Sequence, residues 1–388
     1  MKYMPIILLL VTMNVSGQKF DQLALTPPMG WNSWNYFECD HVNEQVIMKM
    51  ADAMVSSGMK DAGYRYIIID DCWQVGRDRY GKIVVDSLKF PNGIAMLADY
   101  IHSLGLKFGI YSDAGTHTCA GRPGSRGFER EDAESYAEWG VDYLKYDWCN
   151  TQGQDPVESY TLMRDELFRA GRPVVFSICD WGYSKPWEWA GEVGHLWRTT
   201  LDISARWDGS VWGNQLGWTY ILEKQSGLEN YAGPGRWNDP DMLEVGNDGL
   251  TISEARAHFT MWCMLAAPLI TGNDLANMTP EIRDILVNKD LISIDQDPLG
   301  KQGFKIIDRG NFEIWQKPLS GGAIAICLTL IRGTRNTLLT GPKPGSENFR
   351  EIILYRIYGR IKWQEPPAAT NVTVPGHDVV IFRLEKIN

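Results

Sequence analysis

The sequence predicts an α/β protein: a (β/α)8 TIM barrel followed by a C-terminal antiparallel β-sandwich domain. Over the first 300 residues, short apolar segments alternate with amphipathic ones, and acids and tryptophans gather where the apolar segments end. After residue 300, short alternating segments replace this pattern. Strands that alternate with helices indicate a parallel sheet buried on both faces. A chain of 388 residues, 44% of them hydrophobic, is long enough for one large and one small domain.

The N-terminal 17 residues have the pattern of a cleavable signal peptide. Lys2 precedes an apolar run from Pro5 to Val11, and small residues follow at Ser16 and Gly17. This run is far shorter than the roughly 20 residues that a spanning helix needs. We therefore expect residues 1–17 to be removed on export to the periplasm or the medium, which leaves no membrane span in residues 18–388.

Eight apolar segments of strand length are expected between residues 18 and 300, the range assigned to the barrel. They are 27–37, 64–73, 106–115, 141–150, 172–182, 195–203, 235–243 and 264–274. Amphipathic stretches between them, such as 43–63 and 93–106, have the apolar spacing of helices. Eight βα units are the number in a TIM barrel. The alternative, a doubly wound open sheet, lacks support because no GxGxxG or GxxxxGK[ST] loop is present.

The C-terminal segment, residues 301–388, differs in charge and in pattern. It carries 13 Lys and Arg against 7 Asp and Glu, in a chain whose net charge is −10. Short alternating stretches at 312–316, 322–330 and 379–384 are typical of antiparallel strands. Because this segment has no cluster of acids and tryptophans, we expect it to pack against the barrel without taking part in catalysis.

Composition narrows the classes of ligand. A net charge of −10 disfavours nucleic acid and anionic membranes as partners and favours a neutral ligand. The six histidines form no HxH or HExxH group and the seven cysteines form no CxxC, so no transition-metal site is expected. An exported chain with seven cysteines is expected to form one or two disulfides, and at least one cysteine is left unpaired or pairs between chains.

Charged residues follow the apolar segments where the parallel strands end. Lys145 and Asp147 are two positions apart, so they face the same side of their strand together with Tyr143. The other polar residues at strand ends are Asp70, Asp71, Tyr111, Asp113, Asp180, Trp181, Arg198, Asp202, Asp239 and Asp241. The C-terminal ends of barrel strands form the catalytic face, so one rim site is predicted.

Such a ring of carboxylates permits two chemistries. It can hold Mg²⁺ or Ca²⁺, or it can bind sugar hydroxyls while two acids attack a glycosidic bond. The 16 tryptophans favour the sugar, because Trp31, Trp34, Trp73, Trp148, Trp181 and Trp237 adjoin the acids and an indole face matches the C–H face of a sugar. A buried structural salt bridge at Lys145, a metal-dependent hydrolase and a non-catalytic carbohydrate-binding barrel stay open as alternatives.

Five motifs occur in an order that resembles the α-galactosidases (melibiases) of glycoside hydrolase family 27. They are MGWNSW, IIIDDCW, YLKYDWC, WRTTLDI and RWNDPDML. The resemblance is close over residues 24–300, and the tail is similar to the β-sandwich of that family. It implies a retaining, exo-acting α-galactosidase that acts on oligosaccharides or polysaccharides containing galactose and needs no cofactor.

The resemblance also implies roles for single residues. Asp147 corresponds to the nucleophile and Asp202 to the acid/base. The implied pocket consists of Trp34, Asp70, Asp71, Tyr111, Lys145, Cys179, Asp180, Trp181, Arg198, Asp241 and Met242. Asp70 and Asp71 would hold O4 and O6 of galactose, Lys145 would hold O3, and Arg198 would lie near O2. Disulfides are implied between Cys39 and Cys72 and between Cys119 and Cys149.

Elementary electrostatics supports the two catalytic assignments. The positive charge of Lys145 favours ionised Asp147, as a nucleophile requires. Asp202, close to tryptophans and facing a second carboxylate, is expected to tend toward its protonated form. Leu201 and Asp180 stand where relatives often carry glycine and glutamate, respectively.

Specificity within the family follows from the residues around the sugar. The filled, polar Cys179-Asp180-Trp181 segment favours galactose over N-acetylgalactosamine. The Asp70-Asp71 pair favours a sugar with O6 over β-L-arabinopyranose. An α-N-acetylgalactosaminidase and a β-L-arabinopyranosidase are therefore the alternatives within the family.

Overall fold

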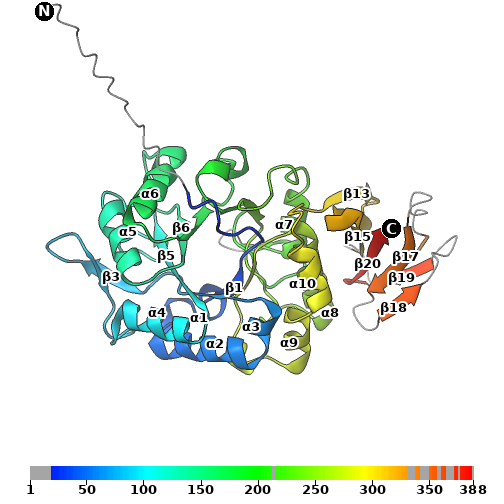
Figure 1. Cartoon of the computed structure of the whole chain (residues 1–388), viewed down its shortest axis with the longest axis horizontal. Coiled ribbons are helices and arrows are strands. Elements are labelled where there is room, and N and C mark those ends of the chain that lie inside the picture. The colour runs from blue at the N-terminus through cyan, green and yellow to red at the C-terminus, as the bar shows by residue number, and fades with distance from the viewer. Residues whose placement is uncertain are drawn as a thin grey trace, which may run out of the picture.

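The computed structural model describes residues 19–211, 215–330, 337–340, 349–355, 360–363, 371–374 and 376–386. A (β/α)8 barrel is followed by a separate antiparallel β domain, which lies at the right of Figure 1 against the α7, α8 and α10 side of the barrel. The expected signal peptide, residues 1–17, lies outside the described residues. Among the described residues, no helix has both the length and the apolarity needed to cross a bilayer.

Eight parallel strands form the barrel in the order of the chain, and each of the eight predicted apolar segments supplies one. They are β1 (Met29–Asn32), β2 (Tyr66–Ile68), β5 (Lys107–Asp113), β6 (Tyr143–Asp147), β7 (Val175–Cys179), β8 (Leu196–Arg198), β11 (Trp237–Asp239) and β12 (Leu269–Thr271). A bridge between Leu243 and Thr271 brings the chain after β11 against β12 and closes the ring. The predicted fold class is thus confirmed.

Helices surround the strands and connect them. The helical elements are α1 (Trp34–His41), α2 (Glu44–Ser56), α3 (Met59–Ala62), α4 (Gly93–Ser103), α5 (Glu129–Glu138), α6 (Pro156–Ala170), α7 (Trp218–Lys224), α8 (Ile252–Leu265), α9 (Pro280–Leu286), α10 (Lys289–Asp295) and the short 3₁₀ turns η1 (Pro186–Glu188), η2 (Ala190–Glu192), η3 (Leu275–Asn277) and η4 (Ser320–Gly322). The predicted stretch 43–63 divides into α2 and α3 at Gly58, whose φ of 87° ends the first helix. Between β7 and β8 only η1 and η2 replace the α-helix of a regular unit.

Capping residues explain where the helices α6 and α8 begin. Asp155 caps α6 by accepting from Glu158 N, and Pro156 follows at the first helical position. Thr251 and Glu254 form a reciprocal capping box at the start of α8.

Short antiparallel pairs of strands lie in two of the loops. They are β3 (Gln74–Arg77) with β4 (Ile83–Val85) and β9 (Ser210–Val211) with β10 (Gln215–Leu216).

The C-terminal domain has a six-stranded antiparallel sheet and a small two-stranded sheet. The strands are β13 (Phe304–Asp308), β14 (Phe312–Pro318), β15 (Ile324–Leu330), β16 (Thr337–Thr340), β17 (Phe349–Tyr355), β18 (Arg360–Trp363), β19 (Asn371–Val374) and β20 (Val379–Lys386). The predicted strands at 312–316, 322–330 and 379–384 are confirmed as β14, β15 and β20.

Alternation along these strands explains how the domain attaches to the barrel. Trp315, Cys327 and Ile381 belong to the main hydrophobic core that continues into the barrel. Their neighbours Ile314, Leu328 and Phe382, which face the opposite side, pack in a second cluster with Val374 of the small sheet.

The cysteines pair as the family resemblance implies. Cys39 is bonded to Cys72, and Cys119 is bonded to Cys149. The other three cysteines, Cys179, Cys263 and Cys327, are free and buried.

Candidate active site

A cavity of about 480 Å³ opens at the C-terminal ends of the barrel strands. Most of the predicted site residues line it: Trp34, Asp70, Asp71, Tyr111, Lys145, Asp147, Trp181, Arg198, Asp202, Asp241 and Met242. These residues come from seven of the eight strand ends, so the barrel gathers side chains up to 208 positions apart in the sequence. Cys179 lines an adjoining cavity of about 370 Å³ that shares Lys145, Arg198, Asp241 and Met242 with the first.

Asp147, at the end of β6, lies in the middle of a hydrogen-bonded group. Its Oδ2 accepts from Tyr111 Oη at 3.0 Å, and its Oδ1 accepts from the amide of Trp148 at 3.0 Å. Burial raises the pKa of Asp147 to about 6, although the ammonium group of Lys145 opposes this rise. From the sequence we expected the positive charge of Lys145 to determine the pKa of Asp147. The side chain of Asp147 is so deeply buried, however, that desolvation outweighs this charge.

Lys145 connects Asp147 with the paired aspartates after β2. Its Nζ donates to Asp70 Oδ2 at 2.8 Å, and the two side chains are 17% and 3% exposed. Burial acts to lower the pKa of Lys145, but the carboxylates of Asp70 and Asp147 and the nearby Cys179 thiol raise it well above the usual value. Lys145 is therefore a permanent cation at the base of the cavity.

Asp70 and Asp71 point their carboxylates into different surroundings. Asp70 accepts from Asn32 Nδ2 at 2.8 Å as well as from Lys145. Asp71 accepts from the amides of Cys72 at 2.6 Å and Ala120 at 3.0 Å, and burial raises its pKa. Both carboxylates keep acceptor capacity toward the cavity, where a hydroxyl group can donate to them.

Arg198 binds two aspartates that line the cavity. Its Nη2 lies 3.0 Å from Asp202 Oδ1 and 2.9 Å from Asp241 Oδ2. From the sequence we expected Asp202 to lie close to tryptophans and to face a second carboxylate; it lines the cavity with Trp181 and Asp147, but its side chain is 52% exposed and bound to Arg198. The reason is that Asp202 lies in a loop after β8 and not in the strand itself.

Of the strand-end residues predicted for the rim, Asp113 and Asp180 line neither cavity, and Asp180 is the one of these that the family resemblance placed in the pocket. It is buried, and its carboxylate accepts from the amides of Gly182 at 3.1 Å and Ser184 at 2.9 Å, and from Ser184 Oγ. These bonds hold the loop after β7, in which Trp181 takes a left-handed φ of 54° and lines the cavity. Asp180 as a sugar ligand therefore stays a prediction.

Asn35, Ile203 and Gln215 also line the cavity, although the sequence did not single them out, and so does Cys119, which the family resemblance implied only as a disulfide partner. Asn35 and Ile203 adjoin Trp34 and Asp202, so their position in the motifs was a usable signal. Cys119 and Gln215 come from long loops and carried no local signal of that kind.

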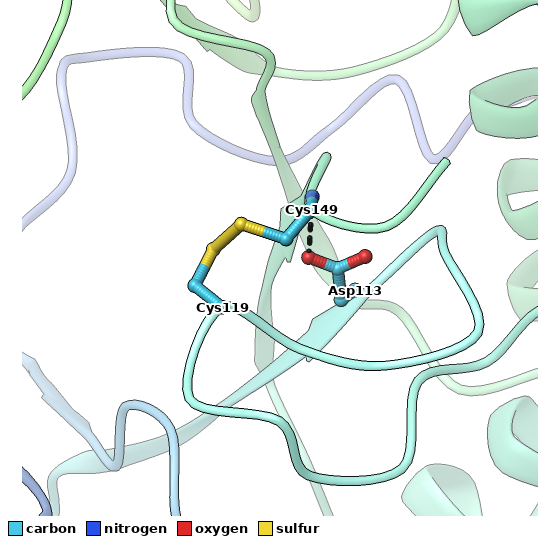
Figure 2. Close-up of side chains that lie close together, drawn as sticks. All are labelled: Asp113, Cys119 and Cys149. Atoms are coloured by element: carbon cyan, nitrogen blue, oxygen red, sulfur yellow. Dashed lines mark hydrogen bonds between the residues drawn. A yellow bond between two sulfur atoms is a disulfide. The ribbon is translucent and has the colours of Figure 1, made fainter. Parts of the chain in front are cut away.

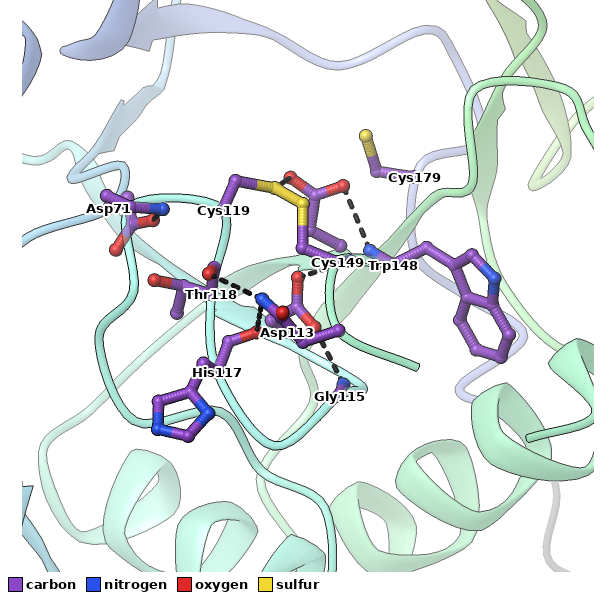
Figure 3. Close-up of a disulfide and its surroundings, with 12 residues drawn as sticks. Asp71, Asp113, Gly115, His117, Thr118, Cys119, Trp148, Cys149 and Cys179 are labelled. Carbon is purple, nitrogen blue, oxygen red and sulfur yellow. Dashed lines mark hydrogen bonds between the residues drawn. A yellow bond between two sulfur atoms is a disulfide. The ribbon is translucent and has the colours of Figure 1, made fainter. Parts of the chain in front are cut away.

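The disulfide between Cys119 and Cys149 lies at the rim, with Asp71 on one side of it and Cys179 on the other in Figure 3. Cys119 Sγ is 3.4 Å from Asp147 Oδ2 and 3.6 Å from Tyr111 Oη. A covalent link thus holds the loop after β5 against the end of β6, next to the Asp147 carboxylate.

Two groups of three potential metal ligands occur in the described part of the chain. In the first, Asp113 lies beside Cys119 and Cys149, whose sulfurs are joined as a disulfide and so offer no thiolate (Figure 2). In the second, the ammonium group of Lys305 is bound to Glu223, Asp308 and Glu313 and occupies the position among the acids that a cation would take. Neither donor set suits a cation, and the expectation of a metal-free site stays a prediction.

Asp113 binds backbone amides on both sides of the disulfide-linked loop. Its carboxylate accepts from the amides of Gly115 at 2.6 Å and Cys149 at 2.8 Å. Burial, followed by the charge of Asp147, raises the pKa of Asp113 to about 9. Asp113 is therefore a neutral acid at pH 7, and the folded protein binds one more proton than the unfolded chain, in which an aspartate has a pKa of about 3.9.

This difference predicts a pH dependence of stability. The pKa of Asp113 is higher in the folded protein than in the unfolded chain. Its contribution to the free energy of unfolding is therefore full below about pH 4 and is lost as pH rises to about 9. The amide of Asp113→Asn does not titrate, so only the wild type loses this contribution as pH rises. We therefore expect the difference in Tm, variant minus wild type, to increase by several degrees from pH 5 to pH 8. Glu138→Gln, at a side chain that is 63% exposed, should follow the wild type. A constant difference for Asp113→Asn would contradict the prediction.

Comparison with known proteins agrees with this geometry. The family profile described as alpha galactosidase A (Melibiase_2) matches residues 26–297. Alpha-galactosidase A of Cellvibrio japonicus is 58% identical over 394 residues, which cover 97% of this chain and 96% of the relative. Human alpha-galactosidase A is 42% identical over 340 residues, covering 83% of this chain and 78% of the relative.

Solved structures agree as well. The crystal structure of alpha-galactosidase I from Mortierella vinacea is 36% identical with a TM-score of 0.87, covering 94% of this chain and 98% of that one. An α-galactosidase from Saccharomyces cerevisiae, solved with raffinose, is 32% identical with a TM-score of 0.87 and covers 95% of this chain and 99% of that one. The chain therefore belongs to the melibiase family of α-galactosidases, glycoside hydrolase family 27.

Proposed function

We propose that this protein removes terminal α-D-galactosyl residues from oligosaccharides or polysaccharides with retention of anomeric configuration. Asp147 acts as the nucleophile and Asp202 as the acid/base. The observation that carries the proposal is that both carboxyl groups line one cavity with the Asp70-Asp71 pair, Lys145 and Arg198. A retaining glycosidase needs such a pair of carboxyls on either side of one sugar carbon.

In the first step the ionised Asp147 carboxylate attacks the anomeric carbon, and the bond to the leaving oxygen breaks. Asp202 gives its proton to that oxygen, so the aglycone departs as an alcohol and a β-galactosyl ester of Asp147 is formed. In the second step Asp202 takes a proton from water, and the water oxygen attacks the same carbon. Asp147 is released, and α-galactose is the product.

The surrounding residues orient the sugar in this proposal. Asp70 and Asp71 accept hydrogen bonds from O4 and O6, and Lys145 donates to O3. Arg198 lies near O2, where its contact with Cys179 Sγ at 3.7 Å and the adjacent Trp181 leave little space for an N-acetyl group. These contacts favour galactose over N-acetylgalactosamine.

A substrate panel tests the proposal. We expect kcat/KM for p-nitrophenyl α-D-galactoside to exceed the values for the N-acetyl-α-D-galactosaminide and the β-L-arabinopyranoside by at least about 100-fold, the range in which missing or clashing polar contacts discriminate. NMR of an early time point should show α-galactose first. Preference for either competing glycoside, or β-galactose as the first product, would overturn the proposal.

The pH profile of kcat/KM tests the role of Asp147. Asp147 must be ionised to attack, and its pKa is about 6, so kcat/KM should fall below about pH 6. Well below that pH, kcat/KM should fall tenfold for each pH unit. Lys145→Met removes the cation that lowers this pKa, so the acidic limb should move to higher pH even though substrate binding also weakens. An acidic limb that stays in place would contradict the assignment.

We also propose that residues 1–17 are a signal peptide removed on export, and that the barrel and the β domain divide near residue 300. In support, Lys19, two residues after the proposed cleavage site, is bound to the barrel: its Nζ donates to the carbonyl groups of Gly191 at 2.5 Å and Gly235 at 2.9 Å. The two disulfides suit an oxidising compartment. Mass spectrometry of the protein recovered outside the cytoplasm should show Gln18 as the first residue; an intact Met1 would overturn this.

A further inference from the structure

His377 is the residue through which the C-terminal domain contacts the loop that carries Asp202. It lies in the turn between β19 and β20, and its ring stacks on the indole of Trp207 with a centroid distance of 4.3 Å and an interplanar angle of 4°. Its Nδ1 is 2.7 Å from Glu254 Oε1, in the first turn of α8. One side chain thus joins three parts of the molecule.

Trp207 belongs to the acid/base loop, by which we mean residues 199–211 and 215–217. Within this loop the amide of Leu216 donates to the carbonyl of Asp202 at 2.7 Å. The carbonyl of Trp207 accepts from the amide of Thr219 at 3.0 Å and from its hydroxyl at 2.7 Å. The backbone of the loop is thereby connected from Asp202 to the first turn of α7.

Behind Trp207 a column of aromatic rings leads to the cavity. Trp207 packs edge-on against Trp218 at 4.7 Å, and Trp218 packs edge-on against Trp262 at 6.2 Å. Trp262 Nε1 donates to the carbonyl of Asp241 at 2.8 Å. Asp241 Oδ2 in turn accepts from the amide of Ile203, the residue after Asp202.

The backbone of His377 is held in an unusual conformation. Its φ of 53° is left-handed, which is uncommon for a residue other than glycine. The bond to Glu254 and the neighbouring ion pair of Asp378 with Arg256 at 3.1 Å keep this turn against α8. A strained residue that is held by several partners is a reason to look for a role.

Asp202 needs support from its loop. Its side chain is 52% exposed, and Arg198, which binds its carboxylate, also binds Asp241. The orientation of the carboxyl toward a leaving oxygen therefore depends on where the loop backbone lies. Small misplacements of a reacting group of about 1 Å reduce rates strongly.

We propose that His377 is a positioning residue for the acid/base: by stacking on Trp207 it holds the acid/base loop so that Asp202 reaches the leaving oxygen. The C-terminal domain thus assists proton transfer without contacting the substrate. This inference rests on the proposed role of Asp202.

The test uses the full chain and two substrates that differ in their need for acid. Methyl α-D-galactoside requires a proton on its leaving oxygen, whereas α-D-galactosyl fluoride loses fluoride without one. His377→Asn tolerates the left-handed φ but removes the stacked ring. His377→Phe keeps a ring but loses the bond to Glu254. The matched control at the same domain interface is Arg383→Met, which removes the hydrogen bond from Arg383 Nη1 to Ser293 Oγ of α10 at 3.4 Å and leaves the turn of His377 untouched.

We expect His377→Asn to lower kcat/KM for methyl α-galactoside about tenfold and for the fluoride less than twofold, and His377→Phe to restore the first value to within about threefold of the wild type. Arg383→Met should lower the Tm and leave both kcat/KM values unchanged. Trp207→Leu, which removes the other half of the stack, should show the same selectivity as His377→Asn. This second variant keeps the test decisive if His377→Asn does not fold.

Equal losses on both substrates, or no loss on either, would overturn the inference, because a role in folding alone reduces both rates together. Asp202→Asn calibrates the assay. If it shows no difference between the two substrates, the proposed role of Asp202 fails and the inference falls with it. If the wild type hydrolyses neither galactoside, the proposed function itself fails.

Discussion

Replacing Asp147 by asparagine is expected to lower kcat/KM for p-nitrophenyl α-galactoside by about 10⁴-fold or more, the loss typical of a removed nucleophile. An amide cannot form the galactosyl ester, so the first step has no nucleophile. The fold should survive, because the asparagine oxygen can still accept from Tyr111 or from the amide of Trp148. Burial raises the pKa of Asp147, so losing its charge removes a desolvation cost and the Tm at pH 8 should not fall.

Two controls make this result decisive. Asp147→Ala excludes activity that arises from slow deamidation of the asparagine back to aspartate. Asp113→Asn changes a neighbouring buried carboxyl that does not line the cavity, and its activity should stay within about tenfold of the wild type. Turnover by Asp147→Asn near the wild-type rate, in protein with an unchanged Tm, would remove Asp147 from the mechanism.

Replacing Asp202 by asparagine is expected to reduce kcat/KM for methyl α-galactoside by about 10² to 10⁴-fold, the range of general acid catalysis. The loss for α-galactosyl fluoride should be much smaller because fluoride needs no proton. Asparagine can still accept from Arg198, so the wall of the cavity stays in place.

The second step offers an independent check on Asp202. Water needs a base to attack the galactosyl ester, whereas azide does not. Azide should therefore accelerate turnover of the Asp202→Asn variant and yield α-galactosyl azide. Equal losses on both substrates without azide rescue would assign the acid/base role to another residue.

Strand periodicity and the eightfold pattern explain why most of the site was predictable. Lys145 and Asp147 lie in β6 itself, where a spacing of two residues determines that both face the cavity. Asp70 follows β2 and Arg198 ends β8, and the barrel brings the ends of all its strands to one rim. For residues in strands, local sequence and position in the fold leave little freedom.

Residues in the loops were less predictable. Asp180 follows β7 directly, but its carboxylate turns back to bind Gly182 and Ser184. Gln215 lines the cavity although 13 positions separate it from the nearest predicted residue, Asp202. Nothing in a single sequence specifies how such a loop folds back.

The sequence by itself determined the order of eight strands and the side that each strand residue faces, because these depend on spacing along the chain, and the resemblance of its motifs to the family supplied the pair of catalytic candidates. Only the tertiary structure decided that burial raises the pKa of Asp147 despite Lys145, that Asp202 stays half exposed, and that the C-terminal domain places His377 on the loop of Asp202. Desolvation and ring stacking depend on atoms brought together from distant segments, and their distances cannot be calculated from sequence spacing.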